Sequence, residues 1–132
     1  MARKFIIQQH KTGKPHFDLR VAGDDYVRSW SMLRQPPLLA GEQRLAIERE
    51  AMPLDAMDRR SIYEAAFGTG RVYLWDEGEV DIVHDTPQHL LLELRGRKLS
   101  GTYDLKRMEW YPGNRWLIRK SVVTGQDPER PK

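Results

Sequence analysis

Hydrophobic and polar residues alternate along most of the chain, in short runs rich in Ile, Val, Leu, Tyr and Trp. In an extended strand, such alternation sends apolar side chains to one face and polar side chains to the other. The pattern predicts strands at Lys4–His10, His16–Val21, Tyr26–Met32, Arg44–Glu50, Arg71–Trp75, Leu90–Leu94, Thr102–Met108 and Arg115–Lys120. Short strands at this spacing are typical of a mainly β fold, either a barrel or a sandwich.

Glycine and proline mark the boundaries between these strands. Turn signals stand at Thr12–Pro15, Gly23–Asp25, Glu77–Gly78, Arg95–Arg97 and Pro112–Asn114. Two segments depart from the strand pattern: Gln35–Pro37 predicts a stiff connector, and Pro53–Ala66 predicts a helix with Asp58 as its N-cap. Residues 124–132 have almost no apolar content, so we expect one domain over residues 1–123 and a flexible tail over 124–132.

Composition narrows the functional classes. The 132 residues suffice for one core, and the net charge of +3 permits a polyanionic partner without requiring one. Cysteine is absent, which excludes disulfides and thiolate metal sites, so any metal ion must be held by nitrogen and oxygen ligands. No signal peptide or membrane-spanning run is visible, and we expect a soluble, cytoplasmic monomer with no membrane partner.

Candidate chemistry is concentrated in the second predicted strand. His16, Asp18 and Arg20 are spaced two apart, and apolar residues fill the positions between them. The three polar side chains therefore share one face of the strand, while the apolar ones turn to the core. A face that carries an imidazole, a carboxylate and a guanidinium is a candidate site.

The preceding strand brings a second imidazole to this face. If the hairpin closes with His10 opposite His16, Gln8 falls opposite Asp18, and directly opposed Cβ atoms are about 4.5–5.5 Å apart. His10, His16 and Asp18 then converge, and two imidazoles with one carboxylate are a ligand set for a divalent metal. Two alternatives remain on spacing alone: a merely solvated hairpin face, or the facial triad of a non-haem iron oxygenase.

At these residues the chain resembles the 3′-phosphoesterase domain of bacterial DNA ligase D and its stand-alone relatives. That family has a histidine at the end of a hydrophobic strand, and then a His-Tyr/Phe-Asp-Phe/Leu-Arg run, which His10 and His16–Arg20 reproduce. The similarity continues through Ser29–Ser31, Arg34, Arg44–Glu48, Phe67–Gly70, Val72–Gly78, Leu99–Leu105 and Trp116–Lys120. The matching order covers nearly the whole chain.

The resemblance implies a compact antiparallel β-barrel with one or two short helices. It also implies a divalent metal, Mn²⁺ above all, on His10, His16 and Asp18, with Asp18 and Arg20 as catalytic residues. The implied activity removes 3′-phosphates or 3′-ribonucleotides from DNA or RNA–DNA ends during DNA repair. Implied partners are a separate ligase, polymerase or end-binding protein. The positions that match phosphate or nucleic-acid contacts are Gln8, Arg20, Arg34 and Arg44.

The chain departs from the family pattern after the fourth strand. Where the family has a histidine and a tyrosine, this sequence has Met52 and Ala56, whose side chains cannot donate a proton or a strong hydrogen bond. His84, His89 and Tyr63 are the remaining candidates to replace the lost groups. We therefore expect retained metal binding with weakened or altered esterase activity. The alternative is a catalytically impaired module that binds nucleic-acid ends.

Overall fold

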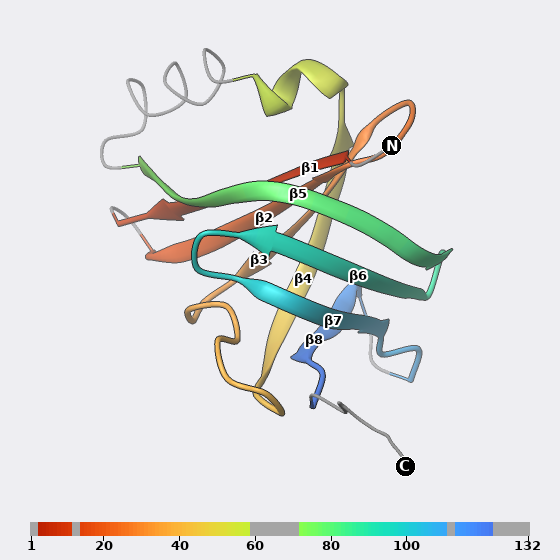
Figure 1. Ribbon diagram of the computed structural model, residues 1–132. Coiled ribbons are helices and arrows are strands. Elements are labelled where there is room, and N and C mark those ends of the chain that lie inside the picture. Colours follow the sequence, from red (N-terminus) through yellow and green to blue (C-terminus); the bar gives the residue numbers. More distant parts are fainter. Residues whose placement is uncertain (1–2, 12–13, 59–71, 111–112, 123–132) are drawn as a thin grey trace.

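Most strands that follow one another along the chain pair antiparallel, and two longer-range pairings close the sheet on itself. The computed structural model describes residues 3–11, 14–58, 72–110 and 113–122. The strand order is that of a closed barrel, β1-β2-β3-β4-β8-β7-β6-β5, in which β4 pairs with β8 and β5 pairs with β1 (Figure 1). The expected mainly β fold and antiparallel barrel are confirmed.

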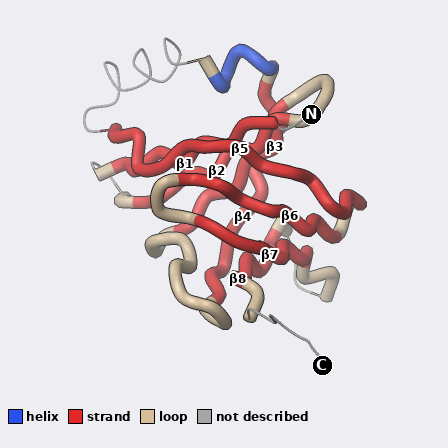
Figure 2. Tube along the Cα trace, viewed as in Figure 1, coloured by secondary structure: helices blue, strands red, loops and turns tan. Residues whose placement is uncertain are grey.

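The strands carry the following bounds. They are β1 Arg3–His10, β2 His16–Ala22, β3 Val27–Met32, β4 Gln43–Met52, β5 Val72–Thr86, β6 His89–Gly96, β7 Ser100–Arg107 and β8 Arg115–Lys120. Figure 2 shows strands throughout the described chain apart from loops and one short helical turn, the 3₁₀ helix η1 at Leu54–Met57. No helix in the described ranges is long and apolar enough to cross a membrane.

Every strand contributes apolar side chains to the interior. Trp30 and Trp116 are fully buried, and their rings meet edge to face with centroids 5.6 Å apart. Such aromatic pairs add to the large hydrophobic contribution of the area that they bury. Around them lie Phe5, Ile7, Leu19, Val21, Ala46, Val80, Leu92, Leu94, Tyr103, Leu105 and Ile118. Leu19 and Val21 thus point inward, so His16, Asp18 and Arg20 face outward from the barrel.

Two sequence expectations are modified by the structure. The strand expected at Arg71–Trp75 continues to Thr86, and the turn expected at Glu77–Gly78 is wrong because Gly78 pairs with Gly96 inside a ladder. At the predicted helix Pro53–Ala66, the described residues form only η1, and Asp58 follows it with an extended backbone. Residues 59–66, with the rest of that prediction, lie outside the described residues, as do the expected tail 124–132 and Tyr63.

Candidate metal centre

The β1–β2 hairpin brings three ligand-type side chains together on the outer face of the barrel. His10 pairs with His16 and Gln8 pairs with Asp18, which confirms the expected register. His10 Nε2 lies 2.9 Å and His16 Nε2 3.3 Å from the same carboxylate oxygen, Oδ2 of Asp18. One ligand atom from each residue lies within 4.8 Å of the other two. The two imidazole rings stack with centroids 4.4 Å apart.

This donor set fits a divalent metal ion. Metal–ligand bonds of about 2.0–2.2 Å place neighbouring donor atoms about 2.8–3.6 Å apart in tetrahedral or octahedral geometry. The two measured contacts to Asp18 Oδ2, 2.9 and 3.3 Å, fall in that range. His10 Nε2 is buried and forms no hydrogen bond of suitable geometry with the described residues. A nitrogen left in this condition is suited to coordinate an ion.

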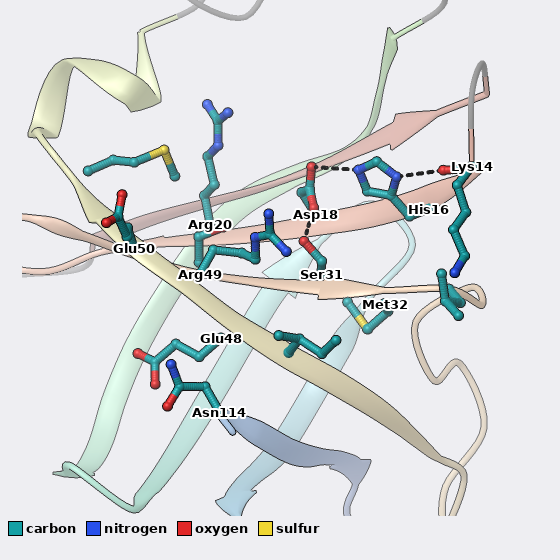
Figure 3. A pocket seen from close by; sticks show the side chains of 14 residues that line it. Lys14, His16, Asp18, Arg20, Ser31, Met32, Glu48, Arg49, Glu50 and Asn114 are labelled. Atoms are coloured by element: carbon teal, nitrogen blue, oxygen red, sulfur yellow. Dashed lines mark hydrogen bonds and ion pairs between the residues drawn. The ribbon is translucent and has the colours of Figure 1, made fainter. Parts of the chain in front are cut away.

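Neighbouring groups hold two of the ligands in place. Ser31 on β3 lies opposite Asp18, and its hydroxyl donates to Oδ1 over 2.5 Å. His16 Nδ1 lies 2.8 Å from the carbonyl oxygen of Lys14. Because that contact requires Nδ1–H as the donor, Nε2 keeps its lone pair on the side of Asp18. Figure 3 shows both contacts beside the contact of His16 with Asp18.

Burial favours the neutral form of His10. It is the main cause that lowers the pKa of the His10 imidazole, Asp18 opposes it, and His16 and Arg20 lower it further. A lowered pKa favours the neutral imidazole, which is the form that ligates metals. Burial also lowers the pKa of the Arg20 guanidinium, against the attraction of Asp18.

An open groove of about 910 Å³ runs from this cluster across the outer faces of β2, β3 and β4. His16, Asp18 and Arg20 line it at one end. The other described lining residues are Lys14, Ser29, Ser31, Met32, Leu33, Ile47, Glu48, Arg49, Glu50, Met52 and Asn114 (Figure 3). The groove therefore combines cations, hydroxyls and an apolar wall next to the candidate metal ligands.

Arg20 is anchored at one atom and available at others. Its Nη1 donates to the backbone oxygen of Ala56 in η1 over 2.7 Å, which fixes the side chain along the groove. Its Nε is buried and has no hydrogen-bond partner among the described residues. A guanidinium held in this way can present an N–H edge to an oxyanion.

The other predicted residues divide between this site and elsewhere. Gln8 is fully buried beside Asp18, and both polar atoms of its amide lack a partner among the described residues. Arg34 and Arg44 do not line the groove, and Arg44 Nε donates to the carbonyl oxygen of Gln35 over 2.6 Å. Met52 does line the groove.

The histidines considered as replacements lie on other strands. His84 is on β5 and His89 is on β6, where His89 Nε2 lies 2.6 Å from Asp104 Oδ1 and the two imidazole centroids are 4.9 Å apart. Neither histidine is among the described residues that line the groove. Neither imidazole of this pair therefore lines the groove beside Met52.

Sequence reasoning missed Ser31 as the partner of Asp18 and Arg49 as a groove residue. Ser31 could be predicted from the sequence, because the short turn between β2 and β3 sets their register and places Ser31 opposite Asp18. Arg49 could not be predicted, because a long connector separates β3 from β4 and their ladder contains a register shift between Val27 and Ser29.

Comparison with known proteins identifies the family. Residues 8–107 match the DNA ligase D 3′-phosphoesterase domain. Among the relatives is the multifunctional non-homologous end joining protein LigD of Mycobacterium bovis, 34% identical over 88% of this chain and 16% of that protein. The LigD proteins of Pseudomonas aeruginosa and Mycolicibacterium smegmatis are 31% and 29% identical, over 82% and 89% of this chain.

The match covers most of the chain, and the fold and the hairpin geometry agree with it. This chain belongs to the DNA ligase D 3′-phosphoesterase domain family. It spans about a sixth of the length of the LigD proteins that it matches, 14–16% of each.

Proposed function

We propose that the chain is a divalent-metal-dependent phosphoesterase that removes a 3′-phosphate or a 3′-terminal ribonucleotide from DNA or RNA–DNA ends in repair. The observation that carries this proposal is the convergence of His10, His16 and Asp18 in a member of this family. Their separations suit a shared ion, and the adjoining groove is open enough to admit a strand end.

His10, His16 and Asp18 would hold the ion, and Mn²⁺ is the metal that we propose. When bound, the ion supplies Lewis-acid charge stabilisation beside the scissile phosphate. Arg20 binds non-bridging phosphate oxygens through the N–H groups that Ala56 leaves free. The Gln8 amide, which is buried without a partner among the described residues, donates a further hydrogen bond to the phosphate. Ser31 keeps the Asp18 carboxylate oriented toward both imidazoles.

Arg34 and Arg44 act at a distance from the reacting phosphate in this proposal. Neither lines the groove, and Arg44 Nη2 lies 3.9 Å from Oε1 of Glu42. We propose that they guide the nucleic-acid strand by charge. Screening limits such guidance to about 8 Å at physiological salt. A separate ligase, polymerase or end-binding protein would receive the processed end.

A second candidate function is binding of a nucleic-acid end without cleavage. It is favoured by Met52, which lines the groove where the family pattern has a histidine. Loss of one acid or base group typically lowers a rate about 10²–10⁴-fold. The metal and Arg20 would still neutralise phosphate charge, so a strand end could bind and persist.

Release of phosphate from a 3′-phosphorylated DNA oligonucleotide tests both candidates. With Mn²⁺ we expect turnover that EDTA abolishes and that His10→Ala lowers by more than about 100-fold, since even partners of metal ligands contribute 10–100-fold. His84→Ala, which removes an exposed imidazole on β5, is the matched control and should retain turnover. Turnover that survives His10→Ala would contradict the proposed metal centre. Binding without any turnover would favour the second candidate.

A further inference from the structure

Arg49 is a cation in the groove whose role is not accounted for by the proposed metal centre. It lies on β4, where it pairs with Ser29, and it lines the groove together with Arg20 and Asp18. Figure 3 shows its guanidinium pointing toward Ser31 and Asp18, whereas Arg20 extends toward η1. Within the described ranges, no hydrogen bond or ion pair engages the Arg49 side chain. Its N–H groups are therefore open to a ligand.

The charge around Arg49 favours an anion. Of the two glutamates that flank Arg49 on β4, Glu48 is paired with Arg28, whose Nη2 lies 3.0 Å from its Oε2. Asp18 contacts the two imidazoles and the Ser31 hydroxyl, and it forms no ion pair with Arg49. Glu50 lines the groove and is exposed to solvent. Arg20 and Arg49 thus bring two guanidinium groups to the groove that Asp18 lines, Arg20 on the side of η1 and Arg49 on the side of Ser31.

We propose that Arg49 is a phosphate-binding residue that clamps a terminal phosphomonoester together with Arg20. This inference rests on the proposed function, which puts the phosphate in the groove. A terminal phosphate carries a charge of about −1.5 to −2 near pH 7, whereas an internal diester carries one charge. Two guanidinium groups that donate to its oxygens from different sides suit the more highly charged group. The Met52 side chain has no donor to offer, and Arg49, three residues earlier on β4, supplies one to the same groove.

Binding of short oligonucleotides in EDTA tests this clamp apart from catalysis. Two DNA strands that differ only in a 3′-phosphate or a 3′-hydroxyl are compared by fluorescence anisotropy. Wild-type protein should bind the phosphorylated strand more tightly, and Arg49→Gln should lose about tenfold of that preference, as expected for one charge-assisted hydrogen-bonded pair. Arg49→Lys keeps the charge but not the planar fork, and should recover only part of the preference.

Arg119→Gln is the matched control, because Arg119 is an exposed arginine on β8 that does not line the groove. It should weaken both strands equally and leave the preference unchanged. A preference that survives Arg49→Gln, or a wild-type protein with no preference, would overturn the clamp. If Arg49→Gln loses the preference but wild-type protein shows no Mn²⁺-dependent turnover, the clamp stands and the esterase proposal fails.

Discussion

Two carboxylates with little exposure, Asp18 and Asp76, have different partners and therefore different roles. Asp18 faces two imidazoles and one hydroxyl, a set that an ion can complete. Asp76 is 3% exposed and accepts the backbone N–H of Glu77 on β5 at 2.9 Å. It also accepts three backbone N–H groups at the turn between β6 and β7, from Arg97 at 2.8 Å, Lys98 at 3.2 Å and Leu99 at 2.8 Å. Its hydrogen-bonding capacity is used by the fold, so we assign Asp76 to stability.

Asp76→Ala should lower the free energy of unfolding by about 2–4 kcal/mol, because one buried and three partly buried N–H groups lose their acceptor. Thermal unfolding followed by circular dichroism measures the effect. Asp81→Ala is the control, since Asp81 is exposed and pairs on the surface with Arg95 over 2.8 Å. Its melting temperature should stay close to that of wild type. Equal melting temperatures for the two variants would show that the Asp76 contacts contribute little.

At the scale of single residues, the sequence predicts those positions that depend on spacing within a strand or a hairpin. The alternation in β2 places His16, Asp18 and Arg20 on one face, and the five-residue connection from Lys11 to Pro15 brings His10 opposite His16. The orientation of Arg49 and the burial of Gln8 depend on strands distant in sequence, so spacing alone does not reveal them.

Among the strands, β5 shows that a glycine can mark either a turn or a close approach between two strands. Gly78 follows Glu77 in a pattern typical of a turn, yet β5 runs on through it to Thr86. A Cβ atom at Gly78 would lie 2.1 Å from the backbone oxygen of Arg95 and 2.7 Å from Gly96 Cα. Glycine is required there by the close approach of β6, a situation that a sequence pattern does not separate from a turn.

Gly78→Ala should therefore destabilise the β5–β6 ladder. The added methyl group meets backbone atoms that cannot rotate away, and overpacking of this kind typically costs about 1–3 kcal/mol. Urea unfolding monitored by tryptophan fluorescence measures the change in midpoint. Val83→Ala, at a 61% exposed position of the same strand, is the control and should shift the midpoint less. A Gly78→Ala midpoint like that of wild type would mean that the strands separate at little cost.

At the scale of the whole molecule, closure of the barrel is the feature that the residues alone predict least well. Most pairings of consecutive strands follow from short turns, but β1–β5 and β4–β8 join segments far apart in the chain. Alternation predicts only that each strand has a buried face, which a sandwich would satisfy equally. The resemblance to a known family, rather than periodicity, favoured the barrel.

Closure also links the candidate metal centre to global stability. β1 carries His10 and pairs with both β2 and β5, so an ion that joins His10 to the β2 ligands ties strands on which the closed sheet depends. A ligand that binds only the folded state stabilises it by about 2.7 kcal/mol at 100 times its Kd. Saturating Mn²⁺ should therefore raise the melting temperature of wild-type protein by several degrees. Asp18→Asn should lose most of that rise, whereas His89→Ala, on β6 away from the groove, should retain it. Because the readout is the metal-induced shift within each variant, any change in stability of the apo variant cancels. Equal shifts in wild type and Asp18→Asn would place the bound ion elsewhere on the barrel.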